Sequence, residues 1–298
     1  MTETNSSGKK SGKLILENPF IGSLIVPIAI VLVGALIIFG VTKLLSSDRS
    51  YRDLVDELQS KTFGNKWVAA YELSKKLNSS QIPKSDYPWL VENLSLAYLS
   101  SADPRTRGFI IAALGSMREP LSKNIILKAL SDSDKEVQFH AVVALGNLPK
   151  ESMTGGQFDS SLLIEKLKGD DQLLKQSAML VLATFKVAEA QDLIRPFLRD
   201  QNVILKYSAA TALINFQDEV ALEVLSEILL LKEPALKEKD PLTSLDASQI
   251  ADFKMGVLLA LNNTKWTKLN DKLEEVVKVE SNAKIALKAK DTLINLKN

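Results

Sequence analysis

The sequence predicts an all-α protein, in which about seven helix pairs stack into a right-handed α-solenoid behind one membrane-spanning helix. Three observations lead to this expectation. A 21-residue stretch near the N-terminus has no charged side chain, apolar residues beyond position 50 recur at helical spacing, and the same helical pattern returns seven times at offsets of 31 to 48 residues.

The composition is charge-balanced and free of cysteine. The 298 residues include 37 Lys and Arg, 36 Asp and Glu, and no Cys. The balance argues against a nucleic-acid-binding protein, which usually carries a basic excess or a basic stripe. The lack of cysteine excludes thiolate nucleophiles, thiolate metal sites and disulfides, and it leaves the compartment open.

The first 50 residues predict a tail, an anchor and a linker. Residues 1–20 are polar and rich in small residues, which favours a disordered tail. Residues 21–41 could form a helix of roughly 31 Å, which matches the hydrocarbon thickness of a bilayer. A cleaved signal peptide is the main alternative, but the apolar stretch is long for one and no A-x-A-like site follows it. Residues 42–50 would then link the anchor to a body at 51–298.

The charges beside the anchor do not decide its orientation. Lys9, Lys10 and Lys13 precede it, and Lys43, Arg49 and Arg52 follow it. A short basic tail held inside and a large translocated body is a common arrangement for such anchors. We therefore favour a single-pass protein of the cell membrane with an extracytoplasmic solenoid.

The body repeats a two-helix unit. The first helices are expected at 51–59, 88–99, 123–130, 161–168, 190–198, 221–231 and 269–277, and the second helices at 65–77, 103–117, 134–148, 171–185, 202–216, 251–264 and 281–296. Within the second helices, small or apolar residues align with Ala141, and leucines align with Leu145 in every pair but the first, which has Ser74. Because this spacing places both columns on one face, each pair must bury that face against its neighbours.

The motif of the second helix resembles that of a known family. A turn Asp is followed by an apolar–basic pair and by A-x-x-A-L-G, most clearly in "DPRTRGFIIAALGSM" and "DKEVQFHAVVALGNL". This pattern resembles the HEAT repeats, in particular the short bacterial PBS-lyase-like variety and membrane-anchored bacterial HEAT-repeat proteins. The resemblance covers about residues 51–298. It is weakest in the last two pairs, where no turn Asp stands in register.

One column of the second helices is mostly basic: Arg107, Gln138, Lys175, Lys206 and Lys254. It could be a stripe that binds an acidic partner or lipid headgroups. The resemblance implies the other interpretation, an internal ladder in which these residues pair with turn acids, here Asp103, Asp134 and Asp171. We favour the ladder and keep all five residues as candidate protein-binding positions.

The single histidine, His140, stands in a column that accepts almost any residue. Acid–base catalysis or metal binding would need partner groups, and the chain has no second His and no Cys. We therefore expect a surface or semi-exposed helix residue.

Two further features are candidates for partner contact. The longest offset inserts residues 232–250 between two helices, a loop with Lys232, Lys237 and Lys239 in which Asp246 could cap the next helix. Trp67 could be an aromatic anchor, or it could cover the end of the solenoid.

No enzyme motif accompanies these repeats, so the sequence predicts a protein without catalytic activity, cofactor, metal or small-molecule substrate. The first hypothesis is a membrane-tethered scaffold that binds another protein, itself expected at the membrane, through the solenoid surface. The alternative is an accessory subunit of a membrane enzyme or transporter complex, assembled through its span, where Gly22, Gly34 and Gly40 would allow close helix approach.

Overall fold

The computed structural model describes residues 49–60, 64–153, 159–234, 238–240 and 243–297. Tyr51–Asn298 form one compact unit. No helix among the described residues has the length and apolar character needed to cross a membrane. The predicted tail, the predicted span at 21–41 and most of the linker lie outside the described residues.

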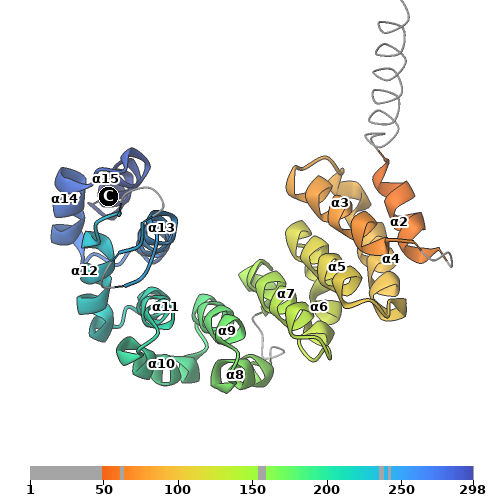
Figure 1. The fold of residues 1–298 in the computed structure, drawn as a ribbon, viewed down its shortest axis with the longest axis horizontal. Helices are drawn as coiled ribbons and strands as arrows, with labels where there is room; N and C mark the ends of the chain where they lie inside the picture. Colours follow the sequence, from red (N-terminus) through yellow and green to blue (C-terminus); the bar gives the residue numbers. More distant parts are fainter. Residues whose placement is uncertain (1–48, 61–63, 154–158, 235–237, 241–242, 298) are drawn as a thin grey trace, which may run out of the picture. The chain divides into compact units, whose positions relative to one another are not determined.

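The described residues form seven helix pairs, which confirms the all-α solenoid (Figure 1). In chain order they are α2 (Tyr51–Gln59) with α3 (Lys66–Asn78), α4 (Tyr87–Ser100) with α5 (Pro104–Met117), α6 (Lys123–Ala129) with α7 (Lys135–Gly146), α8 (Ser161–Lys168) with α9 (Gln172–Thr184), α10 (Ala188–Ile194) with α11 (Val203–Leu213), α12 (Leu222–Leu230) with α13 (Ala247–Thr264), and α14 (Asn270–Val279) with α15 (Ala283–Lys297). We number them pair 1 to pair 7. A 3-10 turn, Arg195–Arg199, continues α10.

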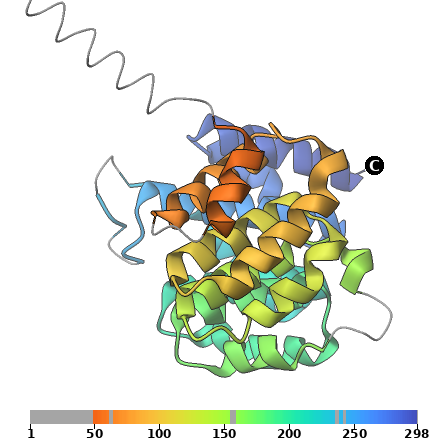
Figure 2. The same cartoon turned by 90° about the vertical axis from the view of Figure 1, so that its right-hand side faces the viewer.

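The second helices form a row of their own. Each of α3, α5, α7, α9, α11 and α13 contacts the next second helix in the chain. The first helices lie on the other side of this row, as Figure 1 shows, and Figure 2 shows the helices along their length. The face of the second helices that points away from the first helices is called the second-helix face below.

A short polar side chain caps the start of the second helices α5, α7, α9, α11 and α13. Asp103, Asp134 and Asp171 accept hydrogen bonds from backbone N–H groups of the first turns of α5, α7 and α9. Such a cap is worth about 1 kcal/mol. Asp246 caps α13 in a capping box with Gln249, which confirms the predicted cap. Because α13 begins at Ala247, the last four residues of the predicted loop belong to the helix instead.

The core follows the columns that the sequence indicates. The column of Ala141 is completely buried in all seven pairs, and the leucines that align with Leu145 are buried from pair 2 to pair 6. Pair 7 differs only in that Leu293 is partly buried; the preceding Thr292 is buried, as Ala113 and Ala144 are at the same position of pairs 2 and 3. The buried face of α15 keeps the register of the other second helices, with one leucine less buried in the pair where the motif is least regular.

The glycine of the A-L-G motif marks a close helix contact. A Cβ built on Gly115 of α5 would lie 2.6 Å from both Cα and Cβ of Ala144 on α7. Only a residue without a side chain fits at this approach. This is a physical reason for the Gly of the motif in pair 2.

Candidate interaction surface

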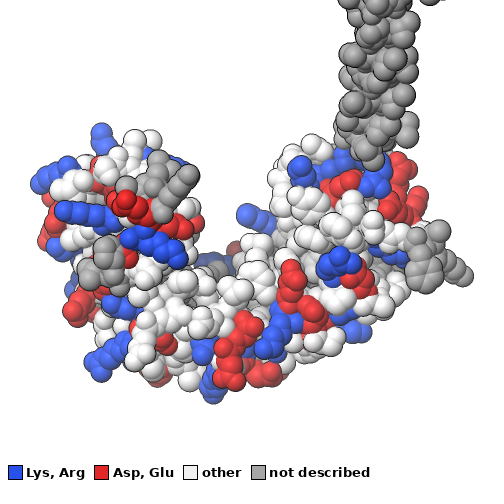
Figure 3. Space-filling view, in the orientation of Figure 1, with Lys and Arg blue, Asp and Glu red and all other residues white. Residues whose placement is uncertain are grey.

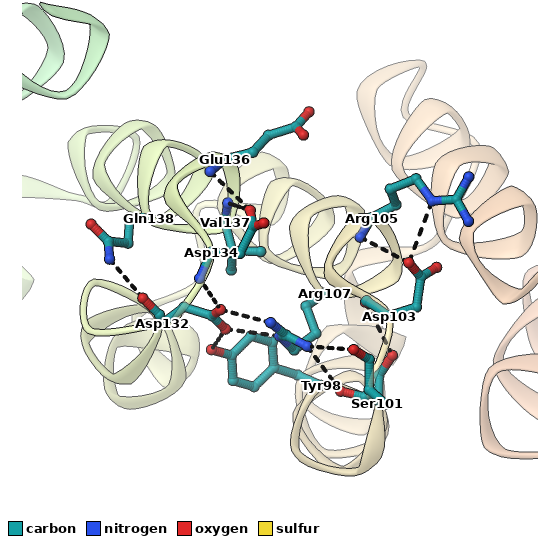
Figure 4. A network of polar contacts seen from close by, with 11 residues as sticks. Tyr98, Ser101, Asp103, Arg105, Arg107, Asp132, Asp134, Glu136, Val137 and Gln138 are labelled. Atoms are coloured by element: carbon teal, nitrogen blue, oxygen red, sulfur yellow. Dashed lines mark hydrogen bonds and ion pairs between the residues drawn. The ribbon is translucent and has the colours of Figure 1, made fainter. Parts of the chain in front are cut away.

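The basic column begins with an arginine that is engaged inside the protein. The Arg107 guanidinium donates two hydrogen bonds to the Asp132 carboxylate, with Nε–Oδ2 2.8 Å and Nη2–Oδ1 2.7 Å, and the Tyr98 hydroxyl donates a third at 2.7 Å (Figure 4). Only 12% of the Arg107 side chain and 6% of the Asp132 side chain are exposed. This geometry leaves Arg107 little capacity to bind an acidic partner.

The same contacts shift the pKa of Asp132. Burial raises the pKa of this carboxyl, but hydrogen bonds from Arg107, the Asp134 backbone N–H and Tyr98 outweigh burial and lower the pKa to about 2. Burial and the Asp132 carboxylate raise the pKa of Tyr98.

We expect Asp132 to contribute to the acid sensitivity of the fold. Because its folded pKa of about 2 lies below the ordinary 3.8, its stabilisation is complete above about pH 4 and is lost as the pH falls toward 2. The loss should amount to roughly 2 kcal/mol. Urea unfolding of the wild type and Asp132→Asn at pH 5 and pH 2.5 measures it. The variant is less stable at pH 5 but should lose less stability on acidification, and an equal loss would contradict this assignment.

Two lysines of the basic column are also paired. Lys206 donates to Glu227 of α12 at 2.7 Å. Lys254 forms an ion pair with Glu280, with only 3% and 5% of the two side chains exposed. Both acids belong to the pair that follows the lysine, so these contacts tie successive pairs together.

The remaining two positions of the basic column make other contacts. Gln138 donates to the backbone carbonyl of Asp132 at 2.6 Å, within its own pair. The Lys175 ammonium lies 5.6 Å from the centre of the Phe197 ring, and no ion pair of Lys175 occurs in the part of the chain that the structure describes.

The structure corrects the acids expected for a ladder. Asp103, Asp134 and Asp171 cap their own helices, and the Arg107 fork is directed to Asp132 instead. The acids that accept a hydrogen bond from an Arg or Lys of the preceding pair, called the cross-pair acids below, are Asp86, Asp132, Asp218, Glu227 and Glu280. The acids bound by Arg107, Lys206 and Lys254 stand 25, 21 and 26 residues after the base. An Asp or Glu that follows each base at this separation in the sequence is therefore the signal that indicates these partners.

Trp67 lies on the second-helix face, in a small cavity of about 250 Å³ between α3, α5 and α7. Its ring is stacked on Phe109 with centroids 6.4 Å apart, and the Arg105 guanidinium lies 5.4 Å from its ring centre. Trp67 is half-buried, so part of it is exposed beside Phe109 and Arg105.

His140 lines the same cavity and is half-buried, as a semi-exposed helix residue would be. Its ring lies against Phe109 and Phe139. Burial lowers the pKa of His140, while the negative charge of Glu136 opposes that shift. Within the described residues no group of three or more His, Asp or Glu side chains is arranged to hold a metal ion.

A second cavity lies on the same face further along the chain. It measures about 360 Å³ and lies between α9, α11 and α13. Ser208 and Gly256 of this cavity align with Phe109 and His140 of the first. The repeat pattern of the sequence does not predict this cavity, although the small residues of that column indicate where space remains.

The inserted loop contributes two exposed lysines, Lys232 and Lys239, while Lys237 lies outside the described residues. Lys232 lines a cavity of about 270 Å³ that also contains Lys254 and Glu280. Figure 3 shows Lys and Arg interspersed with Asp and Glu over the visible face. The solenoid therefore presents mixed charges there.

The comparisons with known proteins agree with this architecture. Residues 91–154 and 160–238 match the family model for HEAT repeats. No curated protein matches the sequence. The CpcE–CpcF complex of phycocyanin lyase from Nostoc sp. PCC7120 is similar in structure, with a TM-score of 0.56, 17% identity, and coverage of 83% of this chain and 95% of that chain. A designed armadillo repeat protein gives a TM-score of 0.45 at 16% identity, with 83% and 100% covered. At 17% identity the likeness to the CpcE–CpcF complex shows the fold alone.

Proposed function

We propose, from the HEAT repeats that this chain contains at 91–154 and 160–238, that the protein is a non-catalytic scaffold that binds another protein through its second-helix face. One observation supports this choice of surface above the others. The basic column is largely engaged in internal contacts, whereas the second-helix face carries two cavities at equivalent positions of the repeat.

Apolar groups on the second-helix row support the same choice. Tyr71, Val143, Leu173, Leu259 and Leu287 are large apolar residues of second helices, each at least 40% exposed. Single exposed apolar residues are common on protein surfaces, but here they accompany cavities with aromatic walls. A partner that covers this face would bury both.

The tether is the second part of the proposal. The uncharged stretch at 21–41 supports a single membrane-spanning helix that holds the solenoid at the cell membrane, with the solenoid on the extracytoplasmic side and the partner in or at the same membrane. Protease treatment of intact and of lysed spheroplasts tests the side. The solenoid should be digested in intact spheroplasts, and protection until lysis would place it on the cytoplasmic side.

Partner capture tests the scaffold. Full-length protein is purified from membranes in mild detergent, and the proteins that accompany it are identified and compared with those that accompany a chain lacking residues 1–45. We expect a stoichiometric partner with both. A partner that accompanies the full-length chain alone would contradict recognition by the solenoid and support the accessory-subunit alternative.

The surface itself is tested by a substitution at its aromatic cavity. Trp67→Ala together with Phe109→Ala should reduce partner capture by at least about tenfold, since buried aromatic residues supply much of the affinity of interfaces. The matched control is Leu121→Ala, an exposed apolar residue in the 3-10 turn directly before the first helix α6. If the control reduces capture as much as the double variant does, the second-helix face is not the binding surface.

A further inference from the structure

The cavity between α9, α11 and α13 contains a polar group with no partner. Only 2% of Ser208 is exposed, and its Oγ has no hydrogen-bond partner. Four other serines in the helices of this chain bond to the carbonyl four residues earlier: Ser95 to Val91, Ser116 to Ala112, Ser177 to Leu173 and Ser226 to Leu222. Burying a hydroxyl without a partner is unfavourable. Ser208 therefore differs from its counterparts in a way that a bound ligand would explain.

The cavity is open because the residues around its floor are small. A Cβ built on Gly256 meets no atom closer than the Thr211 Cγ2 at 3.8 Å. In the first cavity the equivalent positions hold Phe109 and His140, whose rings occupy the corresponding space. The volume of about 360 Å³ lies within the range of small-ligand and side-chain sites.

The lining residues define the chemistry of an occupant. Leu180, Ile204 and Phe253 provide apolar walls. Asp252 provides an exposed carboxylate that has no ion pair in the described part of the chain, and Gln176 adds an amide. The lining residues include no Lys or Arg. This site favours a group that has an apolar stem, several N–H donors and a positive charge.

We infer that this cavity binds an arginine side chain of a partner polypeptide, an inference that rests on the scaffold function proposed above. The methylene stem of the arginine lies along the apolar walls. Its planar guanidinium pairs with Asp252, lies against the Phe253 ring and donates to the Ser208 hydroxyl. Arginine fits better than lysine because it presents five N–H donors in a plane, whereas lysine presents a compact ammonium.

Short peptides test the inference on the full-length protein in mild detergent. The probes are fluorescein-labelled pentapeptides of glycine with arginine, lysine or citrulline at the centre, and fluorescence anisotropy measures their binding. Citrulline has nearly the shape of arginine without its charge. We expect the arginine peptide to bind at least about tenfold more tightly than the citrulline peptide, and more tightly than the lysine peptide. Equal affinities of the arginine peptide and either other peptide would overturn the assignment.

Variants place the binding in this cavity. Asp252→Asn should remove the preference for arginine over citrulline, and Gly256→Leu should abolish binding because its side chain fills the open space. Ser208→Ala should weaken binding by about threefold to tenfold without lowering the Tm, because the hydroxyl has no partner in the free protein. Glu136→Gln, in the first cavity, is the matched control and should bind normally. Unchanged binding by Asp252→Asn or Gly256→Leu overturns the inference.

Partner capture separates a failure of this inference from a failure of the scaffold. Gly256→Leu should capture less partner than the wild type does. If it captures as much, the cavity does not take part in recognition and the inference fails while the scaffold stands. If the wild type captures no partner, the scaffold fails, and the peptide measurements still decide whether the cavity binds arginine.

Discussion

Lys254→Ala is expected to lower the free energy of unfolding by about 3–5 kcal/mol, because removing one member of a buried ion pair leaves the other charge without compensation. Lys254 is 2% exposed, and the Glu280 side chain is 5% exposed. Glu280 would retain only its hydrogen bond from the Asn282 backbone N–H among the contacts of the described residues. Urea unfolding at pH 7 measures the loss.

Lys175→Ala is the matched control for Lys254→Ala. Lys175 occupies the same column but is half-buried, and its contact with the Phe197 ring is worth about 0.5–1 kcal/mol. Its replacement should therefore cost at most about 1 kcal/mol. The double variant Lys254→Met with Glu280→Leu should recover most of the loss. Equal losses in Lys254→Ala and Lys175→Ala would show that burial of the pair does not determine the effect.

Gly115→Ala should lower the free energy of unfolding by about 1–3 kcal/mol, as overpacked cores do, although alanine favours the helix by about 1 kcal/mol. The added methyl would lie 2.6 Å from the backbone Cα of Ala144, so α5 and α7 would have to move apart. The change in the midpoint of urea unfolding measures the effect.

Gly256→Ala tests whether the effect of Gly115→Ala comes from the close approach or from the loss of a glycine. Gly256 also lies inside a helix, but it faces open space. Its replacement should raise the free energy of unfolding by about 0.5–1 kcal/mol through helix propensity. If Gly115→Ala were stabilising by the same amount, the contact between α5 and α7 would be looser than 2.6 Å implies.

The helices of the fold are predictable because each repeat carries the same capping residues and the same apolar spacing. The first helix at 51–59 and that at 161–168 have the predicted bounds, and Asp103, Asp134 and Asp171 lie where the second helices begin. Capping residues, helical periodicity and turn residues act over a few neighbouring positions, so a single sequence is enough to predict the helices. The partial exposure of Leu293 in pair 7 does not follow from helical periodicity, because burial also depends on the neighbours that pack against the helix.

The contacts between pairs were less predictable. Arg107 was expected to pair with a turn acid, and its partner is Asp132 because the guanidinium extends to the next pair. Which acid lies within reach depends on loop lengths that differ from pair to pair. The cavity with Ser208 was missed for a similar reason: a small residue leaves a space only when no neighbouring side chain fills it.

The cross-pair acids divide the joints of the array into two kinds. Pairs 2 and 3, 5 and 6, and 6 and 7 are joined by ion pairs to Asp132, Asp218 and Glu280, whose side chains are at most 6% exposed. Among the described residues the ion pair of pair 4 with a neighbour, Lys135 with Asp171, is long at 3.9 Å and exposed. Protonation of the buried carboxylates weakens the first three joints more than it weakens the joints of pair 4, where the carboxylate contacts are exposed. Acid would therefore loosen the array first toward its ends, where the buried carboxylates lie. Cold weakens apolar packing, so it would also loosen the middle of the array.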